Sequence, residues 1–75
     1  MKNLEELGRI LSDMYNNAPR KEQVTKIHLF GITYANDIRI VGIREVVDES
    51  KIPSTYKAEV NKGVNLSKYV TVRVI

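Results

Sequence analysis

The apolar residues between positions 3 and 17 recur three and four residues apart, which is the period of an α-helix. This stripe consists of Leu4, Leu7, Ile10, Leu11, Met14 and Tyr15. Asn3 can accept a hydrogen bond from a free backbone amide, and Glu6 can complete a capping box with it. We therefore predict a first helix from Asn3 to Asn17, ended by turn-forming residues before Pro19.

Two patterns compete between Arg20 and Val41. Small and apolar residues recur at helical spacing over about four turns, which favours one long second helix. The β-branched composition, with residues 35–37 as a turn, is instead typical of two short strands. We favour the helix, in which Gly31 would mark the close approach of another helix, whereas in a strand it would mark a bulge. The helical stripe consists of Val24, Ile27, His28, Gly31, Tyr34, Ala35 and Ile38.

A short third helix is predicted after Gly42, which breaks the preceding element. Ile43, Val46 and Val47 stand at steps of three and four, on one face of a helix of about two turns that reaches Ser50.

A fourth helix is predicted after the proline at position 53. Pro53 keeps the residue before it extended and fits the first turn of a helix itself. The apolar residues that we assign to this helix are Tyr56, Ala58 and Val60. We expect it to end with Lys62 in its last turn, where the helix dipole favours a cation, and with Gly63 as a left-handed cap.

The tail from Leu66 to Ile75 changes to a period of two, which predicts a strand. The alternation sets Val70, Val72 and Val74 against Thr71, Arg73 and Ile75. A lone strand needs a partner, either residues 38–41 or the same tail of a second subunit, and the alternative is a frayed terminus. We favour burial of the tail. The predicted fold is thus mainly α, a compact domain of four helices that allows for a short C-terminal β-strand.

The composition indicates what class of protein this is but says little about its function. The chain of 75 residues is short enough for one domain. A domain of this size hides only about 60% of its unfolded surface, so its core is small. The absence of cysteine excludes disulfides and thiolate metal sites. The net charge of +3 is compatible with a polyanionic partner but equally typical of any soluble protein.

His28 is the single histidine and the main candidate for site chemistry. A metal site needs several converging ligands, and neither a second histidine nor a cysteine is present. The four glycines are scattered and form no phosphate-binding loop. We therefore interpret His28 as a residue packed on a helix face, and predict neither enzyme activity nor a bound metal or cofactor.

The distribution of charge also bears on location. Glu5 and Glu6 lie where a signal peptide would be basic and then apolar. The longest uncharged run, Ile27 to Asn36, is far shorter than the ~18 apolar residues of a membrane span. We expect a cytoplasmic protein without membrane contact.

Residues 42–63 are similar to a bacterial helix-turn-helix, because a helix, a short turn and a second helix follow one another there. The apolar residues that would fix the two helices to each other are Val46, Val47, Ile52 and Val60. The whole chain also resembles a family of short bacterial proteins described as helix-turn-helix-like, in its segments IHLFGITYA, IPSTY and VNKGVNLSKYV. This second resemblance covers most of the chain and implies a single domain of that kind over residues 1–75, but little about function.

Three positions depart from the helix-turn-helix pattern. The turn usually holds glycine where Lys51 stands, and an apolar residue usually stands at the place of Ser50. Lys57 lies where the second helix usually buries a branched apolar residue, so Tyr56 would replace it from the neighbouring position. These differences predict an interhelical geometry that is only helix-turn-helix-like.

The resemblance implies that the second helix enters the major groove of DNA with its N-terminal residues nearest the bases. Ser54, Thr55 and Lys57 would then contact base edges or nearby phosphates, and three further cations would contact phosphates. The candidate nucleic-acid-binding residues are Arg44, Lys51, Ser54, Thr55, Lys57 and Lys62.

Two functions of different kinds remain open. A DNA-binding module, acting as a small regulator, predicts that the candidate residues share one positive face. A protein-interaction or assembly module, acting as a homodimer or an adaptor, predicts instead that the valine-rich tail or an apolar patch on the second element is exposed. A helix pair with a tight turn is also a common packing unit.

Overall fold

The first helix begins at the predicted capping box. In the computed structural model, which describes residues 1–73, the Asn3 side chain accepts a hydrogen bond from the Glu6 backbone N–H at 2.9 Å. The Glu6 carboxylate accepts one from the Asn3 backbone N–H at 3.2 Å. Helix α1 (Leu4–Asn17) then ends at an extended Ala18 before the proline. The predicted first helix is therefore confirmed.

Residues 20–41 are helical, as favoured, but the prediction of one long helix is wrong because the chain breaks at Tyr34. The elements are η1 (Arg20–Glu22), α2 (Gln23–Thr33) and α3 (Ala35–Val41). A straight helix over the whole segment would be about 33 Å long, longer than the 28 Å greatest extent of the molecule. The break turns the chain back over the core, and the rings of Phe30 and Tyr34 meet there at 5.4 Å.

The remaining helices form a pair joined by a short turn. They are α4 (Ile43–Ser50), the single-turn η2 (Ser54–Tyr56) and α5 (Lys57–Leu66). The short helix after Gly42 is confirmed. The predicted end at Gly63 is wrong, since α5 continues through it to Leu66. With the break at Tyr34, residues 1–73 contain five α-helices where four were predicted.

Gly63 fails as a cap because it lies buried where α5 crosses α2. A Cβ atom on Gly63 would stand 2.5 Å from the carbonyl oxygen of His28 and 3.0 Å from the Cα of Gly31. A Cβ on Gly31 would stand 2.6 Å from the carbonyl oxygen of Val60. The two glycines let the backbones touch, which confirms the close approach predicted at Gly31. Lys62 consequently lies inside α5 rather than in its last turn.

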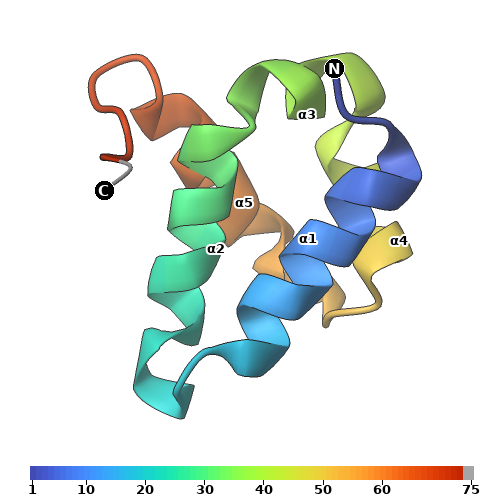
Figure 1. Cartoon of the computed structure of the whole chain (residues 1–75), viewed down its shortest axis with the longest axis vertical. Helices are drawn as coiled ribbons and strands as arrows, with labels where there is room; N and C mark the ends of the chain where they lie inside the picture. The colour runs from blue at the N-terminus through green and yellow to red at the C-terminus, as the bar shows by residue number, and fades with distance from the viewer. Residues whose placement is uncertain (74–75) are drawn as a thin grey trace.

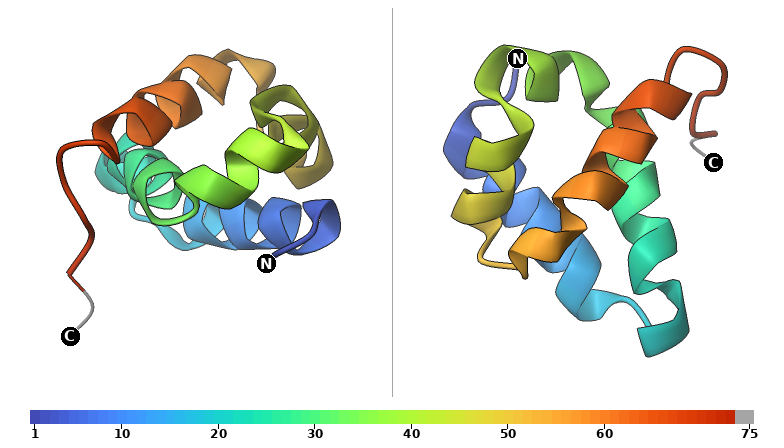
Figure 2. Two further views of the ribbon diagram at one scale, coloured as in Figure 1. Left: turned by 90° about the horizontal axis from the view of Figure 1, so that it is seen from above. Right: turned by 180° about the vertical axis from the view of Figure 1, so that it is seen from behind.

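The helices surround one core. Helices α1 and α2 run antiparallel, α4 packs on α1, and α5 packs chiefly on α2 (Figure 1). Seen from above, α1 and α5 lie on opposite sides of the molecule, with α3 across one end (Figure 2, left). The buried apolar residues are Leu7, Leu11, Ile27, Phe30, Ala35, Ile38, Val46, Val47, Ile52, Val60 and Val64.

The tail does not form the predicted strand in the part that the structure describes. Residues 67–69 make a last turn, in which the Tyr69 N–H donates to the Leu66 carbonyl at 2.9 Å. Residues 70–73 are irregular and mostly exposed, so both the strand and the favoured burial of the tail are wrong for them, while residues 74 and 75 lie outside the described residues. The proposed partner, residues 38–41, belongs to α3 and therefore offers no free strand edge.

Candidate nucleic-acid interface

The turn between α4 and α5 is built on Lys51. Its backbone lies in the left-handed region, with φ 64° and ψ 15°, and its N–H donates to the Asp48 carbonyl at 3.3 Å. This is the conformation for which glycine is preferred. The lysine therefore adopts the glycine geometry of a helix-turn-helix turn, and the first departure from that pattern changes the side chain but not the backbone.

Ser50 is buried in the same turn and has both of its hydrogen-bonding roles satisfied. Its hydroxyl donates to the Val47 carbonyl at 2.6 Å and accepts from the Ile52 N–H at 3.3 Å. The serine thus orients the backbone that carries Ile52 into the core. The second departure replaces an apolar contact by two hydrogen bonds.

The third departure exchanges the roles of two neighbouring residues. Tyr56 is half-buried and its ring meets that of Tyr15 at 5.2 Å, tilted by 60°. Lys57 is also half-buried, at the start of α5. Tyr56 therefore anchors the N-terminal end of α5 to α1, as expected from its neighbouring position, and Lys57 is left at the flank of the exposed side.

One side of α5 is turned to solvent and carries no acidic residue. Within α5, Asn61 and Lys62 lie three and four residues after Ala58, and Asn65 lies one turn further on, so these four share a helical face; Ser54 of η2 stands four residues before Ala58. This surface, called the α5 face below, consists of Ser54, Ala58, Asn61, Lys62 and Asn65, all exposed. Thr55 is exposed at its edge. The α5 face thus combines hydroxyl, amide and ammonium groups around one small residue.

The single acid of this segment, Glu59, points toward α2 instead. Its carboxylate lies 2.7 Å from His28 Nε2 and 3.5 Å from Lys62 Nζ. The hydrogen bond with His28 lowers the pKa of Glu59, with a smaller lowering by Lys62 and an opposing effect of desolvation. The ionised Glu59 therefore links α5 to α2 through its contact with His28. His28 is half-buried at this contact, in keeping with its interpretation as a structural residue.

The six residues predicted from sequence fall into two groups. Lys51, Ser54, Thr55, Lys57 and Lys62 lie on the turn or along α5, and all but the half-buried Lys57 are exposed. Arg44 is exposed at the other end of α4 from Lys51. The other exposed residues of α4 before the turn are acidic: Glu45, Asp48 and Glu49. The local charge around Arg44 is therefore mixed.

Asn61 and Asn65 were missed by the sequence prediction. Both belong to the α5 face, one and two turns after Ala58. Their spacing from Ser54 was readable in the sequence. Because the helix was predicted to end at Gly63, Asn65 fell outside it, and only the first turn was assigned to the interface.

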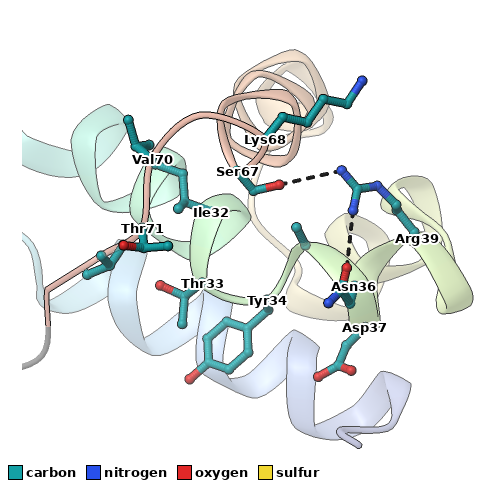
Figure 3. A pocket seen from close by; sticks show the side chains of 12 residues that line it. Ile32, Thr33, Tyr34, Asn36, Asp37, Arg39, Ser67, Lys68, Val70 and Thr71 are labelled. Atoms are coloured by element: carbon teal, nitrogen blue, oxygen red, sulfur yellow. Dashed lines mark hydrogen bonds between the residues drawn. The ribbon is translucent and has the colours of Figure 1, made fainter.

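A hollow of about 470 Å³ lies between the corner of α2 and α3 and the tail (Figure 3). Arg39 crosses its edge and donates to Asn36 at 3.2 Å, to Ser67 at 3.4 Å and to the Val64 carbonyl at 3.3 Å. This arginine fastens the end of α5 to α3. We interpret it as a structural residue and not as part of the interface.

Within residues 1–73, no three metal-ligating side chains gather into a site. No helix of the described chain has the length and apolar character needed to cross a membrane.

Comparison with protein families identifies the family of this chain. The family model described as HTH-like domain matches residues 3–73. The chain therefore belongs to the HTH-like domain family, in agreement with the resemblance found in its sequence. Searches of curated proteins and of solved structures gave no match.

Proposed function

We propose that this HTH-like domain binds duplex DNA through the α5 face and the turn before it. Membership in the family supports a fold of the DNA-binding type. The observation that carries the proposal is the charge of the exposed surface. Between residues 51 and 66 every exposed residue is basic or uncharged, and the only acid, Glu59, is paired with His28. A surface of this kind is compatible with phosphates along its whole length.

In the proposed complex the α5 face lies in the major groove, which is wide enough to admit a helix. Ser54 and Thr55 precede the first turn of α5, so they approach the base edges or the adjoining phosphates. The amide of Asn61 can donate and accept at once, the pairing that reads adenine. Ala58 leaves the backbone free to approach closely and can contact a thymine methyl group.

The cations of the proposed interface act on phosphates. Lys51 lies in the turn, Lys57 flanks the α5 face, Lys62 belongs to it, and Arg44 is a more distant contributor. Three or four phosphate contacts would give a slope of roughly −3 to −4 in a plot of log affinity against log salt. Such contacts fix position and supply affinity, whereas Ser54 and Asn61 would carry base preference.

The experiment is a fluorescence-anisotropy titration of random-sequence duplexes of about 20 base pairs, two helical turns, at several salt concentrations. The Lys57→Glu variant should bind more weakly and lower the salt slope by at least ~1. The matched control is Arg9→Glu, a charge reversal on α1, which lies on the opposite side of the molecule from α5 (Figure 2, left). We expect that control to change affinity much less. Absence of salt-dependent binding at low salt, or an equal effect of both variants, would contradict the proposal.

The alternative, a protein-interaction or assembly module, would rest on exposed apolar residues of the second predicted element or of the C-terminal segment. The exposed residues are Val24 and Ile40 in the former and Leu66, Tyr69 and Val70 in the latter. These five side chains are few beside the roughly 20–30 residues that each partner contributes to a stable interface. The DNA-binding proposal therefore accounts for a larger and more continuous surface.

A further inference from the structure

The C-terminal end of α5 opens into a hollow of about 340 Å³ between α5, α2 and the last turn. This Tyr69 hollow is lined by His28, Lys62, Asn65, Leu66 and Tyr69. Its volume is near the lower end for ligand pockets, about 300–1,000 Å³. It can therefore hold one small planar group more readily than a large ligand.

The surface of this hollow is mostly apolar, although an asparagine, a lysine and a histidine are among its lining residues. Tyr69 is 82% exposed and offers an aromatic ring to a ligand. An exposed aromatic ring beside cations is the usual device for stacking an unpaired base. Asn65 adds an amide, and Lys62 adds a cation at the rim. The nearest acid, Glu59, is engaged with His28 at 2.7 Å and with Lys62 at 3.5 Å.

The hollow is continuous with the proposed DNA interface, because Lys62 and Asn65 belong both to its lining and to the α5 face. A DNA strand that follows the α5 face toward its C-terminal end would arrive at Tyr69. A second copy of this chain is a poorer occupant. Its apolar contact would be small, and the Lys62 side chains of the two copies would meet as like charges.

We propose that the Tyr69 hollow receives one unpaired nucleotide of the bound DNA. The base stacks on the Tyr69 ring, the Asn65 amide lies at the base edge, and Lys62 faces the adjoining phosphate. This inference rests on the proposed function, since the duplex part of the DNA is held by the α5 face. The domain should accordingly prefer a duplex that adjoins unpaired bases over a blunt duplex, with little preference among bases at the stacked position.

The test compares two labelled probes, a blunt duplex of about 20 base pairs and the same duplex extended at one end by unpaired thymines on both strands, a forked duplex. The parent should bind the forked duplex roughly 5- to 10-fold more tightly, the lower part of the range for one stacked base. Tyr69→Ala should abolish this advantage and leave affinity for the blunt duplex unchanged. The variant should fold normally because the side chain it removes is exposed.

Two matched variants separate stacking from other effects. Tyr69→Phe keeps the ring and should keep the preference for the forked duplex. Tyr69→Leu keeps an apolar side chain without the aromatic ring and should lose most of the preference for the forked duplex. Equal binding of both probes by the parent, or an unchanged preference in Tyr69→Ala, would overturn this inference while leaving duplex binding intact. Failure to bind either probe would instead refute the proposed function.

A further outcome concerns self-association. Sedimentation of the parent and of Tyr69→Ala should give the same monomeric mass. A dimer that Tyr69→Ala dissociates would assign the hollow to a second copy of the chain and would overturn the nucleotide proposal.

Discussion

Replacing Lys51 by glycine should relieve a backbone cost in the turn and weaken DNA binding at the same time. Lys51 holds φ at 64° at the end of α4. A left-handed backbone costs an L-residue roughly 1–2 kcal/mol, and glycine removes that cost. Glycine in turn loses about 0.5–1 kcal/mol more chain entropy on folding. The backbone contribution of Lys51→Gly is therefore a gain of about 1 kcal/mol in the free energy of unfolding.

The side chain makes a second contribution, which a matched variant isolates. A cation at the C-terminal end of α4 stabilises the helix dipole by about 0.3–1 kcal/mol, and both Lys51→Gly and Lys51→Ala lose it. Lys51→Ala keeps the strained φ. The difference between the two variants is thus the backbone contribution alone. For a domain of this length about 1 kcal/mol corresponds to a Tm difference of about 4–8 °C.

The assay is thermal and urea unfolding followed by circular dichroism, together with the duplex titration. We expect the Tm of Lys51→Gly to exceed that of Lys51→Ala. Both variants should lose the same affinity for the duplex, and the slope of log affinity against log salt should become shallower by about 0.9 in each. A Lys51→Gly variant no more stable than Lys51→Ala would refute the left-handed turn. Unchanged binding in both variants would remove Lys51 from the interface.

Three further predictions concern the supports of this turn and helix. Gly63→Ala should lower the free energy of unfolding by about 1–3 kcal/mol in urea titration, because its Cβ meets backbone that cannot move aside; a neutral result would contradict the close crossing. Ser50→Ala should cost about 1–3 kcal/mol by leaving the Ile52 N–H unpaired, and an equally stable variant would show that bond to be unimportant. Glu59 has a lowered pKa, so its contribution to stability is present above the ordinary value of 4.5 and is lost as pH falls through the lower folded value. Glu59→Gln should remove that pH dependence of unfolding, and a parent-like profile would contradict the contact with His28.

The helix boundaries that could be predicted are those set by local signals. The capping box of Asn3 and Glu6, the glycine at position 42 and the proline at position 53 act within a few residues of themselves. Each places an end of a helix without reference to the rest of the chain. The same signals located the turn between α4 and α5.

The errors arose where distant segments decide the structure. At Tyr34 the chain breaks although no glycine or proline stands there, because a straight helix would leave the core uncovered. At Gly63 the local rule for a cap gave the wrong result, since the glycine serves contact with α2. The contact of Gly63 joins residues about 30 positions apart, and no pattern within one helix reports it.

The crossing of α2 and α5 also determines how the α5 face is presented. In an isolated helix-turn-helix pair the second helix is oriented by the first, but here α5 packs more extensively on α2 than on α4. Gly31 and Gly63 allow only one rotation of α5, because any neighbouring residue in that contact would bring a side chain into the backbone of α2. A rotation by one residue, about 100°, would carry Asn61 off the exposed side. The geometry proposed to read DNA is therefore set by Gly63, on the side of α5 opposite the α5 face, and by Gly31 of α2, which it meets.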